Sequence, residues 1–194
     1  MDHPTTLIEF MQLYPTEDAC RQAIFEHRFS NGFVCPRCGH GRAWYLDRRA
    51  LYECAACHYQ ASLTAGTIFH NSRTDLRKWF LAIWLLASTK KAPSAAELSR
   101  QLGVTAKTAW LLRRKITHAM ARRQGELLLY GIVELDEGFL GGKHRGPTNR
   151  GRRQPHKTMV AVAAEERPDG TLGRAHMCVT KDGSAASLGA AAKA

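Results

Sequence analysis

The sequence predicts an α+β protein of several modules, and three observations support this fold class. Two cysteine pairs flank short extended runs between residues 31 and 72. Helical periodicity dominates from there to residue 125, and stretches with the period of β-strands follow from residue 131. We therefore expect a small β module that holds a metal, a helical region, and a carboxyl-terminal part that contains strands.

The chain is strongly basic. Among its 194 residues, 28 Lys and Arg outnumber 17 Asp and Glu, which gives a net charge of +11. An excess of this size favours a polyanionic partner, with nucleic acid before a membrane surface. A solvated basic surface without such a partner is the alternative.

Neither a signal peptide nor a membrane span is expected. The first fifteen residues contain acids and lack a charged region followed by an apolar stretch. The longest apolar run, residues 79–87, falls well short of the ~20 residues that span a bilayer. We therefore expect a cytoplasmic protein whose six cysteines are reduced and available to a metal rather than to disulfides.

Residues 1–30 are expected to form short helices. Thr16 is a suitable N-cap for a helix whose first turn carries Glu17 and Asp18. Acidic side chains at that end favour the helix because they face its positive dipole end.

Residues 31–72 have the cysteine spacing of a structural zinc ribbon. Each CxxC pair can ligate one ion from a tight turn, and a hairpin of the runs RAWYL and ALYEC would bring the two turns together. Four thiolates leave no open coordination position, so the Zn²⁺ is predicted to be structural and to supply folding energy. Fifteen residues separate the two pairs, whose members are Cys35, Cys38, Cys54 and Cys57.

Iron binding or redox chemistry is the alternative use of these cysteines, and the two hairpin-spaced pairs favour zinc. His40 and His58 adjoin the pairs, but four cysteines already complete the site, so both are predicted to be surface residues. Cys20 and Cys178 are predicted to be ordinary buried thiols.

Residues 73–125 are predicted to be helical. The first helix repeats apolar residues at the i, i+3, i+4, i+7 spacing of one buried face. These residues are Leu76, Trp79, Phe80, Ile83, Trp84 and Ala87.

A helix from residue 94 to residue 102, a turn, and a helix from residue 106 to about residue 120 have the pattern of a helix-turn-helix. Ser94 and Glu97 are predicted to form a capping box, Gly103 to end the first helix and Thr105 to cap the second. The expected core consists of Leu98, Leu102, Val104, Ala109 and Leu112.

The second of these helices is the candidate DNA-binding helix. The segment between Glu97 and Glu126 contains seven Lys or Arg and no acid. First-turn residues of such a helix usually contact base edges, whereas later cations meet phosphates. Lys107 and Thr108 are thus the candidates for base contacts, and the candidates for phosphate contacts are Arg113, Arg114 and Lys115.

Trp110 lies within this helix and either stacks on a ligand or packs in the core, and packing in the core is favoured. The alternative for the whole region is an ordinary helical hairpin with a solvated basic face.

The stretch GIVELDEGFLGG, residues 131–142, places Asp136 and Glu137 after an apolar strand pattern and before a basic loop. A carboxylate beside such a loop suits a site that holds a divalent cation against a phosphodiester. One aspartate cannot supply the coordination of two-metal catalysis, so a strand-end turn residue remains the alternative. The candidate DNA contacts of the loop are Lys143, Arg145, Arg150, Arg152 and Arg153.

Together, CPRCG, YECAACHYQASLTAGTIFHNSRTDLRKWFLAIWLL, the helix-turn-helix and VELDEGFLGGK resemble bacterial insertion-sequence transposases. The resemblance, from about residue 5 to about residue 190, is to members with an amino-terminal transposase zinc ribbon and an ISXO-type DDE domain of RNase H-like fold. It implies that Asp136 matches the first aspartate of the catalytic triad, at the end of the first strand. It also implies that residues 157–180 form strands two and three, joined by a hairpin at Pro168, Asp169 and Gly170.

With this resemblance, the predicted fold comprises a small β zinc ribbon, a helix-turn-helix, and the first strands of an incomplete RNase H-like α/β domain in residues 126–194. The family's later acidic ligands would follow residue 194, and Asp182 is interpreted as a turn residue beside Gly183. We therefore expect a truncated or frameshifted transposase with an uncovered apolar sheet face.

The resemblance implies binding of double-stranded DNA at the terminal inverted repeats of an element, as a homo-oligomer and in association with the nucleoid. Catalytic Mg²⁺ would serve a complete relative, whereas this chain is expected to bind DNA without cutting it. A zinc-ribbon and helix-turn-helix regulator of transcription is the alternative function. An RNA-binding zinc ribbon is a third, and the helix-turn-helix favours duplex DNA over it.

Overall fold

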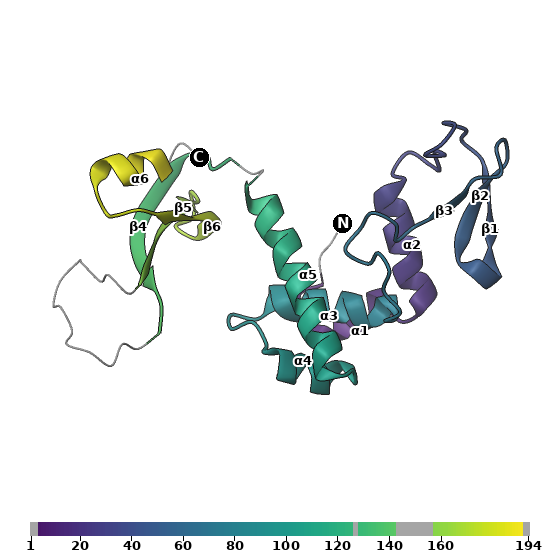
Figure 1. Ribbon diagram of the computed structural model, residues 1–194, viewed down its shortest axis with the longest axis horizontal. Coiled ribbons are helices and arrows are strands. Elements are labelled where there is room, and N and C mark those ends of the chain that lie inside the picture. Colours follow the sequence, from purple (N-terminus) through teal and green to yellow (C-terminus); the bar gives the residue numbers. More distant parts are fainter. Residues whose placement is uncertain (1–3, 126–127, 143–156, 192–194) are drawn as a thin grey trace. The chain divides into compact units, whose positions relative to one another are not determined.

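The computed structural model describes residues 4–125, 128–142 and 157–191. The chain divides into two compact units, residues 1–119 and residues 120–194. The first contains helices and a small β-sheet at one end, and the second contains a three-stranded sheet and a short helix (Figure 1). No helix in the described part of the chain has the length and apolar character needed to cross a membrane.

The helices and strands of the first unit follow the predicted order, with a third strand that was not predicted. One 3₁₀ turn, Asp47–Arg49, joins the first two strands, and the last helix extends beyond residue 119. The elements are α1 Leu7–Leu13, α2 Glu17–Arg28, β1 Ala43–Leu46, β2 Leu51–Cys54, β3 Gln60–Ser62, α3 Leu76–Ser88, α4 Ala95–Leu102 and α5 Ala106–Gly125.

The amino-terminal helices begin at side-chain caps. The Thr16 hydroxyl accepts a hydrogen bond from the Ala19 N–H at 3.2 Å, which confirms the predicted cap of α2. Glu17 has a further role, because its carboxylate accepts from the backbone N–H groups of Leu76 and Arg77 at 2.8 and 3.0 Å. Glu17 thus caps α3 from the neighbouring helix, through a contact between residues 59 apart in sequence.

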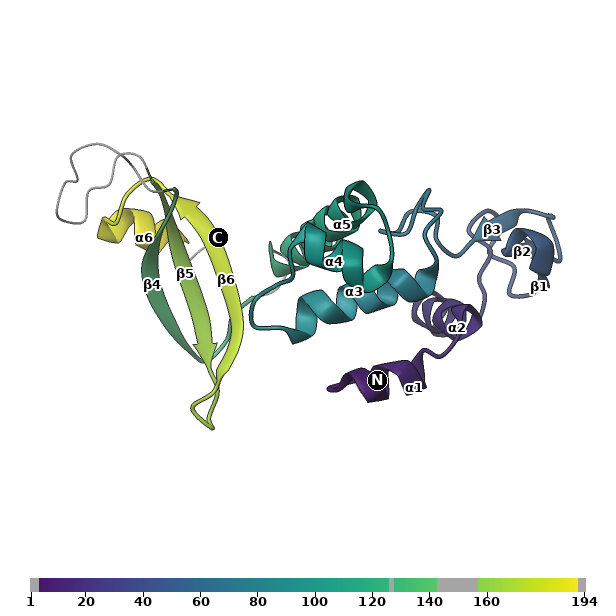
Figure 2. The same ribbon diagram turned by 90° about the horizontal axis from the view of Figure 1, so that it is seen from below.

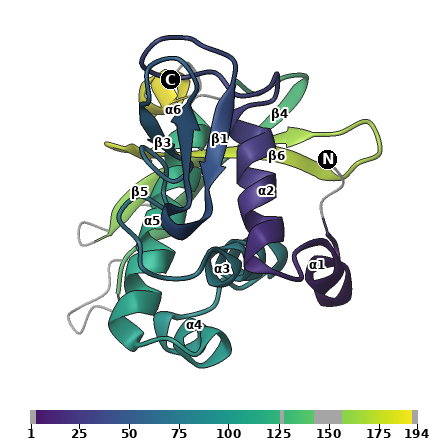
Figure 3. The same cartoon turned by 90° about the vertical axis from the view of Figure 1, so that its right-hand side faces the viewer.

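Helix α3 lies at the centre of the first unit, between α1 and α2 on one side and α4 and α5 on the other (Figures 2 and 3). Trp79, Ala82 and Leu86 face the second pair of helices. Leu76 packs instead against α2, where Cys20 and Ile24 are buried. The core against α4 and α5 also contains Leu98, Leu102, Ala109, Leu112 and Ile116.

The turn between α4 and α5 forms where the sequence predicted it. Gly103 takes a left-handed conformation, φ +59°, that ends α4, and the Thr105 hydroxyl accepts from the Thr108 N–H at 3.2 Å to cap α5. The Ser94 hydroxyl accepts from the Glu97 N–H, which is the N-cap half of the expected capping box. The predicted core residues are buried, except that Val104 is half-buried against them.

The second unit is an antiparallel sheet in the order β4–β5–β6, with bounds Ile132–Leu140, Thr158–Glu166 and Leu172–Thr180 (Figure 2). The predicted hairpin closes through hydrogen bonds from Gly170 N–H to the Arg167 carbonyl and from Arg167 N–H to the Thr171 carbonyl. Met177 and Val179 of β6 are exposed, whereas Val160 of β5, opposite Val179, is buried.

The prediction that Asp136 ends its strand was wrong. Strand β4 continues for four more residues, and Asp136 lies at its middle, opposite Val162 of β5. Gly138 forms no turn here because it pairs with Val160, and Phe139 continues the alternation of the strand opposite Met159.

The last described residues also differ from expectation. The weakly patterned stretch after Thr180 forms helix α6, Ala185–Ala191. One oxygen of Asp182 accepts from the Ser184 N–H and from the hydroxyls of Ser184 and Ser187, and these bonds lower the Asp182 pKa to about 2. Asp182 therefore serves the turn before α6, in agreement with its interpretation as a turn residue.

Candidate metal centre and nucleic-acid interface

The two cysteine pairs lie in turns of the same backbone design. The N–H of Cys35 donates to the carbonyl five residues later, and Cys54 does the same, each at 2.9 Å. In each turn the residue four positions after the first cysteine takes a left-handed φ, +74° at Gly39 and 56° at His58. His58 adopts this conformation although it is strained for a residue other than glycine. Its exposed ring lies 3.3 Å from the Glu53 carboxylate.

The hairpin of β1 and β2 brings these turns together. Sulfur atoms of Cys35 and Cys57 are 3.7 Å apart, those of Cys38 and Cys54 are 3.5 Å apart, and all four lie within 4.8 Å of one another. Zn–S bonds of about 2.3 Å require S···S edges of about 3.8 Å in a tetrahedron. The four predicted ligands therefore form a zinc-ribbon site suited to a structural Zn²⁺.

The thiols of this cluster differ in acidity. Burial acts to raise the pKa of Cys54, but N–H groups of Cys57 and Ala56 outweigh it and lower the pKa to about 6. At Cys38 a backbone contact with His40 acts to lower the pKa, yet hydrogen bonding to Cys57 and burial raise it to about 12. A bound cation would favour deprotonation of all four thiols.

The ribbon is attached to the helices by aromatic contacts and by the side chain of Arg28, which is exposed. The Tyr52 ring of β2 stacks on Phe25 of α2 with centroids 4.9 Å apart. The Arg28 guanidinium donates to the carbonyls of Leu63 and Ala65, each at 2.8 Å. The metal site and the helical core are consequently parts of one unit.

The candidate DNA-binding helix presents a basic outward face. Lys107 and Arg114 of α5 are exposed, and the helix contains no acidic residue. The prediction that Trp110 packs in the core was wrong, because its side chain is 48% exposed with the Arg114 guanidinium 5.3 Å from its ring centroid. Ala109, one position earlier, occupies the buried side, and a step of about 100° turns Trp110 away from the core.

The other predicted contacts on α5 have partners within the protein or are partly covered. The Thr108 hydroxyl lies 2.9 Å from that of Thr105, and Arg113 is half-buried. The Lys115 ammonium donates to the carbonyls of Ile68 and His70 at 3.3 and 3.1 Å. Lys115 thus fastens α5 to residues 68–70, near the end of the segment predicted as the ribbon. The predicted loop contacts, Lys143, Arg145, Arg150, Arg152 and Arg153, lie outside the described residues.

Asp136 is exposed on β4, and one of its oxygens accepts from the Glu137 N–H at 2.8 Å. In the register of the sheet it lies opposite Val162, which in turn lies opposite Met177. Within the described ranges, the four cysteines are the one group of three or more His, Cys, Asp or Glu close enough to share an ion.

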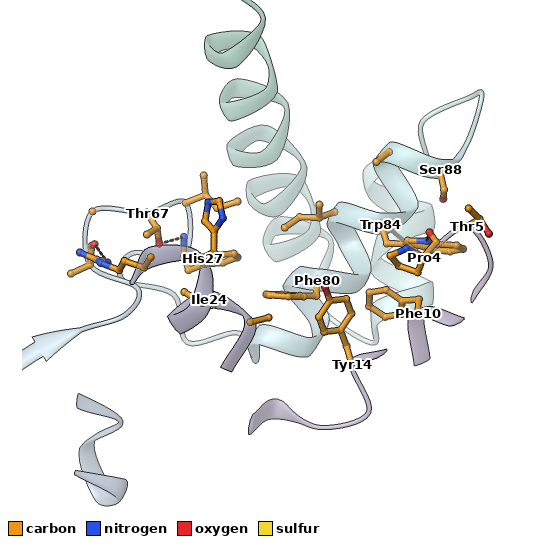
Figure 4. Close-up of a pocket in the computed structure, with 18 residues that line it drawn as sticks. Pro4, Thr5, Phe10, Tyr14, Ile24, His27, Thr67, Phe80, Trp84 and Ser88 are labelled. Atoms are coloured by element: carbon orange, nitrogen blue, oxygen red, sulfur yellow. Dashed lines mark hydrogen bonds between the residues drawn. The ribbon is translucent and has the colours of Figure 1, made fainter. Parts of the chain in front are cut away.

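An apolar groove of about 1080 Å³ lies beside α3 in the first unit. Figure 4 shows Phe10, Tyr14, Phe80 and Trp84 gathered along it. The indole N–H of Trp84 donates to the Pro4 carbonyl at 3.0 Å. One apolar face was predicted for α3, but the helix has two apolar sides. One side packs against α4 and α5, and the other lines the groove.

Comparisons with known proteins support the assignment of a zinc ribbon. Residues 15–60 match the transposase zinc-ribbon domain. The chain is 27% identical over 154 residues to an uncharacterized protein in transposable element ISH50 of Halobacterium salinarum. That alignment covers 76% of this chain and 49% of the relative, so the chain spans about half the relative's length. No solved structure matches the chain. These matches support a transposase-like protein of an insertion element that carries a zinc ribbon.

Proposed function

We propose that the protein binds double-stranded DNA at the ends of an insertion element during transposition. The observation that carries this proposal is the outward face of α5, where Lys107 and Arg114 are exposed on a 20-residue helix without an acid. The other side of α5 packs on α4, and a short turn joins the two helices. A basic helix supported in this way suits the major groove of a duplex.

The similarity to a protein in a transposable element favours transposition over the regulation of promoters. Zinc stabilises the ribbon. The ribbon's contacts with α2 in turn support residues 68–70, which Lys115 joins to α5. Inverted repeats present two copies of one site, so we propose that the chain acts as a homo-oligomer on DNA.

The affinity for duplex DNA should fall steeply with salt, because each cation that meets a phosphate releases a counterion. About four phosphate contacts would give a loss of roughly 10²-fold between about 50 and 200 mM salt. The measurement is fluorescence anisotropy with labelled duplexes made from the DNA that flanks the gene.

Arg114→Glu should lower this affinity and flatten its salt dependence. Arg48→Glu is the matched control, since it makes the same charge change at an exposed arginine of the ribbon. An affinity that changes by less than about threefold over the salt range, or an equal loss from both variants, would remove α5 as the contact surface.

We also propose that Asp136 is the first carboxylate of a DDE metal site in an RNase H-like domain whose first strands are β4, β5 and β6. Its opposite residue, Val162, offers no ligand, and neither does Met177 beyond it. Residues 143–156 contain no acid either. Mg²⁺ that coordinates two reacting oxygens needs several carboxylates, so residues 1–194 should bind DNA without cutting it.

Plasmid nicking and strand transfer by the 194-residue chain, measured with Mg²⁺ or Mn²⁺, should stay at background. Strand cleavage that Asp136→Ala abolishes and Glu134→Gln preserves would show instead that these residues suffice for catalysis. Glu134 is the matched control because it is an exposed acid two positions away on the same face of β4.

A further inference from the structure

We infer that Trp110 contacts the 5-methyl groups of thymines in the major groove, and that Arg114, held against its ring, anchors the neighbouring backbone. This inference rests on the proposed DNA-binding role of α5. It names the side chain through which that helix would distinguish one sequence from another.

Two large apolar side chains lie exposed in the middle of the basic face. Trp110 is 48% exposed and Leu111 is 44% exposed, although Ala109 and Leu112 on either side of them are buried. An indole left in water on a structured helix gains free energy when an apolar group covers it. Its position among cations indicates that the covering partner is polyanionic.

The cations around Trp110 are spaced for a groove. Lys107, Trp110 and Arg114 occupy positions i, i+3 and i+7, so they form one stripe along the outward side of α5. The stripe begins in the first turn of the helix, behind the Thr105 cap. In a helix that enters the major groove from this end, side chains of the first turns face base edges, while a cation further along the helix reaches phosphates.

The Arg114 side chain lies over the Trp110 ring. Its guanidinium carbon lies 5.3 Å from the centre of the Trp110 ring, within the range of a cation–π contact. The contact limits the rotamers of both side chains, so less conformational freedom is lost on binding. A planar guanidinium keeps its N–H donors available at the ring edge for phosphate oxygens.

The chemistry of the indole selects thymine among the four bases. Adenine, guanine and cytosine present polar donors and acceptors at the major-groove edge, whereas thymine adds a methyl group. The face of an indole is apolar and can cover a methyl group without leaving a polar atom unpaired. The expected target is therefore a duplex with thymines at the positions that the middle of α5 reaches.

The experiment uses the zinc-loaded, full 194-residue chain. It first selects its tightest duplex from a random-sequence pool, and each thymine of that duplex is then replaced in turn by deoxyuridine, which lacks the methyl group. At one or two positions this replacement should weaken binding by about tenfold. Trp110→Ala should weaken binding to the thymine duplex by about the same factor and remove the preference for thymine over deoxyuridine.

Met120→Ala is the matched control, because Met120 is also 48% exposed but lies on another side of α5. It should keep both the affinity and the thymine preference. Thermal denaturation should show an unchanged Tm for Trp110→Ala, as expected for an exposed side chain.

The outcomes separate the inference from the proposed function. Tight binding of the selected duplex with no effect of either replacement would overturn the inference and leave DNA binding standing. Losses from deoxyuridine and from Trp110→Ala that simply add would also overturn it, because they would place the methyl contact elsewhere. A pool that yields no bound duplex would refute the proposed function itself.

Discussion

Removal of zinc by a chelator is expected to unfold residues 31–62 of the ribbon, which contain β1, β2 and β3, while the helical core of α3, α4 and α5 persists. The ribbon's buried cluster is small and includes two of the metal ligands, Cys35 and Cys54, beside Phe33 and Ala61. Structural zinc sites contribute on the order of 10 kcal/mol of binding free energy, which here is folding free energy. The loss of the ion should therefore melt β1, β2 and β3.

The unfolding caused by zinc removal should stop before the helical core. Phe25 and Phe29 of the α2 region pack both against the ribbon cluster and against the cluster of Cys20 and Leu76, so part of their packing is lost. The cluster of Trp79 and the helices beyond it shares no buried residue with the ribbon cluster. Hydrogen exchange monitored by NMR should lose protection in β1–β3 and keep it in α4 and α5.

Cys54→Ser should reproduce the effect of chelation, because a hydroxyl is a poor zinc ligand. Cys178→Ser is the matched control, a half-buried thiol in the second unit and outside the cysteine cluster. Amide protection in β2 that survives both the chelator and Cys54→Ser would show that the ribbon folds without metal.

The ribbon could be predicted from the sequence because metal coordination is a local constraint. Four cysteines at fixed spacing require two tight turns, and a hairpin is the shortest way to join them. The helix-and-turn pattern from Ser94 to Thr105 was equally readable, since caps and a left-handed glycine depend on neighbouring residues. Glu17 was not readable as the cap of α3, because that contact joins residues far apart in sequence.

The two wrong placements have specific physical causes. In Ala109-Trp110-Leu111-Leu112 the apolar residues outnumber the buried positions, and periodicity alone cannot say which of them turn outward. The spacing of Trp110 between Lys107 and Arg114 was the signal available in the sequence. At Asp136 the glycine two residues later suggested a turn, but pairing with β5 keeps the chain extended, and pairing is a tertiary property.

Trp79→Ala is expected to lower the free energy of unfolding of the first unit by about 4 kcal/mol, the range for truncating a buried tryptophan. Trp79 is 2% exposed and packs edge-on to Phe69 at 5.3 Å. Its indole N–H donates to the Ser72 hydroxyl at 2.8 Å, and the Lys115 ammonium lies 5.7 Å from its ring. The substitution thus removes core volume, a hydrogen bond and the support of Lys115 together.

Lys115 also binds the carbonyls of Ile68 and His70. Because Trp79 supports Lys115, loss of Trp79 should loosen the attachment of residues 68–70 to α5. Urea denaturation of the zinc-loaded chain, followed by circular dichroism, measures the change. Trp79→Phe should recover more than half of the lost stability, since it keeps a ring against Phe69 while losing the indole N–H. Trp110→Ala is the control and should change stability by less than about 0.5 kcal/mol.

The contrast between Trp79 and Trp110 separates folding from recognition in this unit. Trp79 should affect stability strongly and should alter DNA affinity only where the protein is partly unfolded. Trp110 should affect DNA affinity in a protein of unchanged stability. A destabilisation by Trp110→Ala as large as that by Trp79→Ala would mean that Trp110 is covered in solution, and it would remove α5's outward face as a free DNA-binding surface.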